Sequence, residues 1–177
     1  MRTLLSCLAV LFLSCQNNPS SVNELFQEKS FPIEVISKSK MIHTEEGKIK
    51  LEIISEKIER YSGEVSELKF SEGFNVNFYS KSGKIISNLS ALNAIVDEKN
   101  NIMTAKDSVI LKNNEKKLET EVLIWDEKKD KIYTESDVII TTKNEIIYAQ
   151  GFISDPNFSD YTLKNISGKM YLDSPKK

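Results

Sequence analysis

Runs of β-branched and aromatic residues, separated by short charged segments, fill most of this chain. They are clearest in Leu118–Gly151, where the runs Leu118–Trp125, Ile132–Thr142 and Ile146–Gln150 follow one another with no glycine or proline between them. Residues of this kind favour the pleated, half-buried surface of a β-sheet. The charged segments between them belong in water at the ends of strands. The stretch predicts an antiparallel meander.

Turn signals divide the rest of the chain at similar intervals. They lie at Glu46-Gly47, Ser62-Gly63, Glu72-Gly73, Ser82-Gly83, Lys99-Asn100-Asn101, Asn113-Asn114, Lys128-Lys129, Asn144 and Asp155-Pro156-Asn157. From Gly83 onward they are spaced by about 15 residues, so that one hairpin takes about 30. Correspondingly, Ile102–Leu111 aligns with Ile132–Thr141 at an offset of thirty residues. The repeat predicts successive strands stacked into an elongated, twisted, double-layered sheet.

Two segments match a helix as well as a strand. In Gly47–Tyr61 the apolar residues at 51, 54, 58 and 61 suit a helix, whereas those at 49, 51 and 53 suit a strand; Ser87–Val96 is ambiguous in the same way. Both segments lie among predicted strands. The chain between Pro32 and Pro156 also lacks a proline that would interrupt a ladder of hydrogen bonds. We therefore expect a strand in each.

The N-terminus has the organisation of an exported protein. Residues 1–14 hold one arginine and an apolar run too short to cross a bilayer of roughly 30 Å, as expected of a signal peptide. Ser14-Cys15 and the polar residues after it resemble the lipobox of bacterial lipoproteins, which implies lipidation of Cys15. A plain signal peptide cut nearby is the alternative. We expect a lipidated tether over residues 15–30, the folded domain over residues 31–173 and a tail over residues 174–177.

Composition and charge argue against several classes of function. A chain of 177 residues with 40% hydrophobic and 28% charged residues can form one domain with a substantial core. Its formal net charge of −2 supplies no basic stripe, so no nucleic-acid partner is expected. His43 is the only histidine, and no metal-ligand spacing or phosphate-binding glycine loop is present. We expect no catalytic residues, no metal and no cofactor, and therefore no enzyme.

Some predicted strands are apolar on both faces, most clearly at Val122–Trp125 and Val138–Ile140. One face can pack inside the sheet, and the other either lines a groove for an apolar ligand or is buried in a closed sandwich. Both interpretations stay open at this point. The candidates for a groove lining are Leu111, Val122, Ile124, Val138, Ile140 and Tyr148. Gly151 ends a long stretch without glycine and is expected to mark a bulge or a close backbone approach.

Four degenerate motifs follow one another in the second half of the chain. They are Leu118-x-Thr120-x-x-Leu123-x-Trp125, Thr134-Glu135-x-x-Val138, Ala149-x-Gly151 and Gly168-Lys-Met-Tyr171. In this order they resemble the LptC family of periplasmic lipopolysaccharide-export proteins, over roughly residues 85–172. The resemblance implies an all-β fold, an elongated twisted β-jellyroll of the OstA and LptA type. Such a jellyroll is an antiparallel meander open along one side, and its interior holds the acyl chains of lipopolysaccharide.

The resemblance also implies partners and a place in the cell. It implies transport of lipopolysaccharide across the periplasm of a Gram-negative bacterium, from an inner-membrane ABC transporter to an LptA-like jellyroll. The edge strands expected near Phe31–Met41 and Tyr161–Leu172 would offer backbone groups to a partner strand. Many members carry an N-terminal transmembrane helix, whereas this chain offers a lipid anchor, which we expect in the inner membrane. A structural envelope lipoprotein with a sealed core and an LptA-like soluble bridge are the alternatives.

Overall fold

The computed structural model describes residues 31–61 and 66–171. The predicted signal peptide (residues 1–14), the tether with Cys15 (residues 15–30), the turn at Ser62-Gly63 and the tail (residues 174–177) lie outside the described residues. The chain divides into two compact units, Met1–Phe31 and Pro32–Lys177. The second unit contains the whole sheet.

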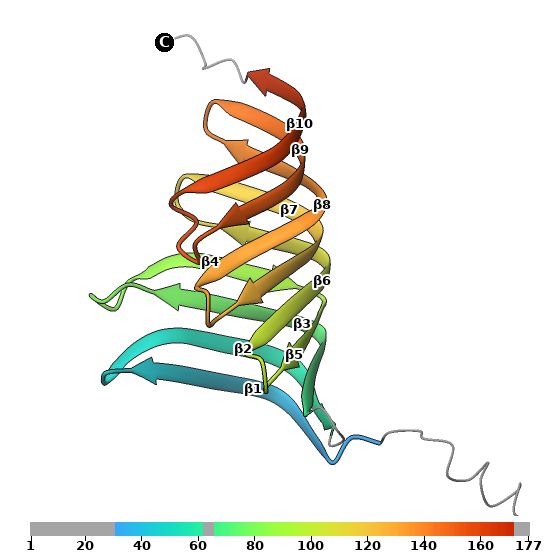
Figure 1. Ribbon diagram of the computed structural model, residues 1–177. Helices are drawn as coiled ribbons and strands as arrows, with labels where there is room; N and C mark the ends of the chain where they lie inside the picture. Colours follow the sequence, from blue (N-terminus) through green and yellow to red (C-terminus); the bar gives the residue numbers. More distant parts are fainter. Residues whose placement is uncertain (1–30, 62–65, 172–177) are drawn as a thin grey trace, which may run out of the picture. The chain divides into compact units, whose positions relative to one another are not determined.

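Ten strands form one antiparallel sheet, and residues 31–61 and 66–171 contain no helix (Figure 1). The strands are β1 (Glu34–Glu45), β2 (Lys48–Tyr61), β3 (Glu67–Tyr79), β4 (Ile85–Ala91), β5 (Asn93–Asp97), β6 (Ile102–Lys112), β7 (Lys116–Asp126), β8 (Lys131–Thr142), β9 (Glu145–Ser154) and β10 (Tyr161–Tyr171). They pair in the order β1-β2-β3-β4-β6-β7-β8-β9-β10, and the short β5 pairs with β3 and β6. The predicted all-β, jellyroll-like meander is confirmed. So are the strands expected in both ambiguous segments.

A line of bulges crosses the sheet near the middle of its long strands. In β6, Asp107 and Ser108 oppose the single residue Glu121 of β7, and in β8, Glu135 and Ser136 oppose only Gly151 of β9. An extra residue of this kind bends a strand and increases its twist. The long strands curve accordingly in Figure 1. Each of them contributes one half to each of two facing layers.

We define the layers by the strand halves on either side of this corner. Layer 1 contains β4 and residues 39–45, 48–55, 74–79, 109–112, 116–120, 137–142, 145–150 and 165–171. Layer 2 contains β5 and residues 34–37, 57–61, 67–71, 102–106, 122–126, 131–134, 152–154 and 161–163. Each layer thus has an inner face toward the other layer and an outer face toward solvent.

The inner faces of both layers form the hydrophobic core. On β8, for example, Ile132 and Thr134 of layer 2 and Val138 and Ile140 of layer 1 are all buried. The largest fully buried side chains are Phe70, Phe152, Phe158, Leu89, Leu111, Leu118, Leu123, Ile132 and Ile140. Burial follows a period of two within each strand half, because successive side chains of a strand point to opposite faces. Removing these apolar faces from water is what holds the layers together.

Two expectations from the sequence were wrong in detail. Glu72-Gly73, predicted as a turn, lies inside β3 and forms its bulge, with φ angles of 65° and 109°. The offset of thirty residues aligned Ile102 with Ile132, whereas the burial pattern aligns Met103 with Ile132. A shift of one residue transfers every side chain to the other face of a sheet. The hairpin repeat is real, but it is one residue shorter than expected.

Candidate functional site

The two inner faces line an apolar cavity, partly open to solvent, at the β1–β2 end of the sheet. Its volume is about 310 Å³, near the lower limit for ligand pockets. The apolar lining comes from both layers and consists of Met41, Leu51, Ile53, Leu68, Phe70, Val96, Met103 and Trp125. The polar lining residues His43, Glu98, Asn101 and Glu127 are exposed or half-buried, so they lie at the mouth. The cavity therefore has the character of a site for an apolar group with a polar head outside.

One weak contact between a histidine and a carboxylate spans the mouth. His43 belongs to β1 in layer 1, and its Nε2 lies 3.9 Å from Oε1 of Glu127, which directly follows β7 of layer 2. About half of the His43 side chain is exposed, at 53%, so solvent screens the contact. An exposed pair of this kind contributes about 1 kcal/mol at most. It does not hold the mouth shut.

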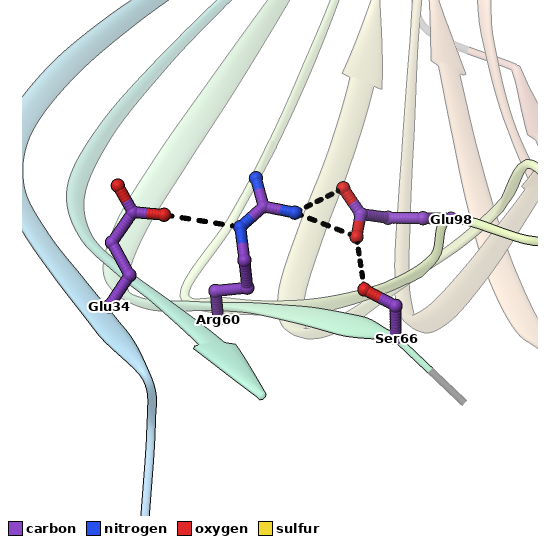
Figure 2. A network of polar contacts seen from close by, with 4 residues as sticks. All are labelled: Glu34, Arg60, Ser66 and Glu98. Atoms are coloured by element: carbon purple, nitrogen blue, oxygen red, sulfur yellow. Dashed lines mark hydrogen bonds and ion pairs between the residues drawn. The ribbon is translucent and has the colours of Figure 1, made fainter. Parts of the chain in front are cut away.

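A stronger polar network joins β2 to β1 and to Glu98 at the mouth of the cavity (Figure 2). Nη1 of Arg60 on β2 donates to both carboxylate oxygens of Glu98, at 2.7 and 2.8 Å, and its Nε donates to Oε2 of Glu34 on β1, at 3.2 Å. The hydroxyl of Ser66 also donates to Glu98. The hydrogen bond from Ser66, reinforced by Arg60, holds the pKa of the Glu98 carboxyl below its usual value. Since Glu98 lines the cavity, the network connects the cavity wall to the edge strand β1.

Trp125 forms the end of the cavity nearest β8. Its ring lies 5.3 Å from that of Phe78 with an interplanar angle of 87°, an edge-to-face contact that joins layer 2 to layer 1. The indole N–H is shielded from water and finds no hydrogen-bond partner among the described residues. A buried, unpaired donor costs about 1–3 kcal/mol, which the packing of the ring must offset. Trp125 thus serves the cavity as an apolar wall.

Beyond Trp125 the space between the layers is closed by the segment joining β9 to β10, residues 155–160, which we call the strap. It leaves layer 2 after Ser154 and returns to layer 2 at Tyr161. Between these points it is bonded to layer 1 and to the β6–β7 turn. Ser87 of β4 donates to the carbonyl oxygen of Pro156, Asn113 donates to that of Phe158 at 3.0 Å, and Lys116 donates to that of Ser159 at 2.7 Å. The strap therefore bridges the open side of the bent sheet.

The strap places one aromatic ring in the core. Phe158 is completely buried, and its ring centroid lies 5.6 Å from that of Phe152 and 5.7 Å from that of Tyr161. The ammonium group of Lys116 lies 5.3 Å from the centroid of the Phe158 ring. The C-terminal part of the interior is consequently filled by a side chain of the protein itself.

The six predicted groove residues are divided between the two faces. Leu111, Val138 and Ile140 belong to the buried core, with at most 2% of each side chain exposed. Val122 and Ile124 are half-buried and lie outside the core cluster. Tyr148 is 40% exposed on the outer face of β9, against Gly168 of β10. None of the six lines the cavity, and a role in lipid contact stays a prediction for each.

The cavity itself draws on earlier strands than the sequence indicated. Its apolar walls come from β1, β2, β3, β5, β6 and β7, and residues such as Leu68, Val96 and Met103 were not among the candidates. Alternation in Leu68-x-Phe70 and in Ala94-x-Val96 was a usable signal for an inward face. Alternation indicates which residues share a face of the sheet, but it does not indicate which part of the interior is left empty.

Gly151 lies at the corner of β9. Its φ is 83°, and a Cβ atom placed on it would lie 2.9 Å from Cδ of Lys164 on β10. Both the backbone angle and the neighbouring strand thus favour glycine at this position.

The described residues hold no cluster of three or more side chains able to bind a metal ion. In the same part of the chain no helix is long and apolar enough to cross a membrane. The site can therefore bury an apolar group, and charged and amide side chains surround its opening.

Comparison with known proteins adds one finding. A family model described as "Lipopolysaccharide-assembly, LptC-related" matches residues 3–168, which is most of the chain. No curated protein matches the sequence.

Proposed function

The chain belongs to the LptC-related lipopolysaccharide-assembly family, and from this premise we propose that it carries lipopolysaccharide across the periplasm by holding acyl chains between its two layers. The observation that carries the proposal is the cavity of about 310 Å³, whose apolar walls come from the inner faces of both layers. Its apolar walls favour the burial of an acyl chain by about 25 cal/mol for each Å² removed from water. The function is transport, and it requires no catalytic group.

The polar mouth supports the same proposal. His43, Glu98, Asn101 and Glu127 stand between the cavity and solvent. A ligand with acyl chains and a polar head can place the chains inside while the head remains hydrated, so that no charge is buried. A purely apolar ligand would gain nothing from this border.

The partners follow from the two edges of the sheet. We propose that β10 pairs with a strand of an LptA-like jellyroll and that β1 faces the inner-membrane ABC transporter. Each edge strand has a backbone side with no neighbour in the described sheet, and both expose large apolar side chains, including Val35 at 53% and Ile166 at 62%. Edges of this kind are templates for strand addition. We propose further that the acylated Cys15 anchors the protein in the inner membrane of a Gram-negative cell.

Photo-crosslinking in cells tests the transport proposal. A photoreactive residue at Leu68, a half-buried position in the cavity wall, is expected to form an adduct with lipopolysaccharide. The matched control is the same residue at Ile153, which is 38% exposed between the buried Phe152 and Ser154 of β9 and therefore lies on the outer face, where no adduct is expected. Adducts at Ile153 alone would contradict a binding site between the layers. Depletion of the protein should also cause lipopolysaccharide to accumulate in the inner membrane.

A second candidate function is that of a structural envelope lipoprotein. The observation that favours it is the strap, which seals one part of the interior with the completely buried Phe158. This candidate predicts no adduct at Leu68 and no accumulation of lipopolysaccharide on depletion.

An LptA-like soluble bridge differs from our proposal mainly in its anchoring. Cys15→Ala is expected to release an anchored carrier from the membrane fraction, whereas a bridge would be found in the soluble fraction with either residue. Immunoblotting of the two fractions distinguishes these cases.

A further inference from the structure

On the basis of the proposed function, we propose that the strap covers a second section of the acyl-chain site and competes with the ligand's acyl chains for it. In the conformation described here, Phe158 occupies this section. When an acyl chain enters, the strap lifts from layer 1 and the ring leaves the core. The site beneath it would take an apolar chain, because its floor is formed by Phe152 and Tyr161.

The covered section lies next to the open cavity. Trp125, which ends the cavity, pairs with Ile132 of β8, and Ile132 pairs with Ser154, the last residue before the strap. One strand therefore separates the two. Ile132 is a fully buried aliphatic residue, so the inner face remains apolar across this strand. An acyl chain that extends from the cavity toward β10 must first pass the contact between Trp125 and Phe78 and then meets the strap.

The strap can lift without breaking the sheet. Tyr161 pairs directly with Ser154, so the β9–β10 ladder begins at the base of the strap and does not include it. The bonds that hold the strap to layer 1 and to the β6–β7 turn come from the side chains of Ser87, Asn113 and Lys116. Such side-chain bonds can exchange with water one at a time, whereas a ladder opens cooperatively.

The backbone of Phe158 also distinguishes the strap from ordinary core structure. Its φ is 55°, in the left-handed region that aromatic residues rarely adopt. Strained residues of this kind persist only where the surroundings hold them in place, and they gather at switching segments and ligand clamps. Lifting the strap would release this strain, and that release offsets part of the burial lost by the ring.

The test compares lipopolysaccharide crosslinking at two inward positions of the full chain in cells. A photoreactive residue at Leu68 reports the open cavity. One at Leu163, which is half-buried and pairs with Phe152, reports the section beside the strap. In the otherwise unchanged protein we expect adducts at both positions, with fewer at Leu163. The ratio of Leu163 to Leu68 adducts is the quantity measured.

Two variants loosen the strap in different ways. Ser87→Ala removes the hydrogen bond from layer 1 to the carbonyl oxygen of Pro156. The ratio of Leu163 to Leu68 adducts should then rise about fivefold, which is the effect of a single neutral hydrogen bond on an equilibrium. Phe158→Ala removes the competing ring and should raise the ratio further. Ser90→Ala, on the same strand, and Phe74→Ala, an equally aromatic core deletion, are the controls and should leave the ratio unchanged.

The outcomes separate this proposal from the one on which it rests. Absence of adducts at both positions contradicts transport between the layers. A second outcome is that adducts form at Leu68 but neither Ser87→Ala nor Phe158→Ala changes the ratio. This outcome overturns the strap proposal alone, because it identifies the strap as a permanent plug. An equal rise in Phe74→Ala would also overturn it, because general loosening of the core would then explain the result.

Discussion

Replacement of Gly151 by alanine is expected to destabilise the protein more than the same replacement at Gly83. The two glycines have nearly equal backbone angles, with φ of 83° and 79°. They differ in their surroundings. A Cβ atom at Gly83 would meet nothing within 4 Å, whereas one at Gly151 would lie 2.9 Å from Cδ and 3.1 Å from Cβ of Lys164. The pair separates backbone strain from the close approach of β9 and β10 at the corner.

The magnitudes follow from these contacts. Left-handed φ costs an alanine about 1–2 kcal/mol, and the stiffer unfolded chain returns about 0.4–1 kcal/mol. At Gly83 these terms leave a loss of about 1 kcal/mol. At Gly151 the Cδ atom of Lys164 can move aside, but its Cβ is fixed by the backbone of β10. Overpacking therefore adds about 1–3 kcal/mol, and we expect a total loss of about 2–4 kcal/mol.

Urea unfolding followed by circular dichroism measures both free energies of unfolding. Each kcal/mol should also lower the melting temperature by about 2–4 °C in a chain of this size. Equal losses at Gly151 and Gly83 would refute the reasoning, because they would show that the corner relaxes without cost. Gly47→Ala is a further control, since its φ is 75° and a Cβ there meets nothing within 4 Å.

Three other predictions concern the network, the edge and the faces of the sheet. Arg60→Met should lower the free energy of unfolding by about 1 kcal/mol at pH 7. The pKa of Glu98 is lowered in the folded state. The stabilisation is therefore present above the pKa of about 4.3 in the unfolded chain, and it is lost as pH falls through the pKa of the folded protein. Unfolding at pH 7 and pH 3 should therefore differ less in the variant, and an unchanged difference would exclude the pair as its source. Ile166→Lys on the exposed edge should weaken binding of an LptA-like partner in a pull-down without changing the melting temperature; unaltered binding would move the interface elsewhere. Leu111→Ala should cost about 2–5 kcal/mol and Tyr148→Ala about 1 kcal/mol or less in the same urea assay, and the reverse order would contradict the assignment of the two faces.

The strap gives the interior two different parts. At the β1–β2 end the layers leave a cavity, and near β10 the strap fills the same space with Phe158. A groove and a sealed sandwich are therefore both present in one sheet, side by side. If the strap is a competitor, the balance between them is set by the ligand. If it is a plug, the carrier holds acyl chains only near β1 and β2.

The strands of this protein can be read from local features of its sequence. Charged turns and β-branched runs are local signals, and they predicted the strands of the meander and most of its connections. The family resemblance, drawn from ordered motifs between Leu118 and Tyr171, was confirmed by the family match. These features were readable because each depends on residues close together in the chain.

The side chains that face inward, in contrast, became known only from the folded sheet. On β7 the inward residues are Leu118 and Thr120 before the corner and Leu123 and Trp125 after it. The inward residues of β7 therefore change from even to odd numbers at the corner, where this strand has a single residue. In β6 and β8, which have two residues at the corner, the alternation of inward and outward residues continues unchanged. A turn signal coincided with the bulge at Glu72-Gly73 but predicted a turn there, and no turn signal marked the corners of β6, β7 and β8, because pairing between neighbouring strands sets the position of a bulge.

The strap was likewise beyond the reach of the sequence. Asp155-Pro156-Asn157 was recognised as a turn, which it is, but its partners Ser87 and Asn113 are distant in the chain. A loop has no period that reports burial, so nothing local distinguished Phe158 from an exposed aromatic residue. Folding brings the β9–β10 connection across the open side of the bent sheet, and that closure determines how much of the apolar interior is left for a ligand.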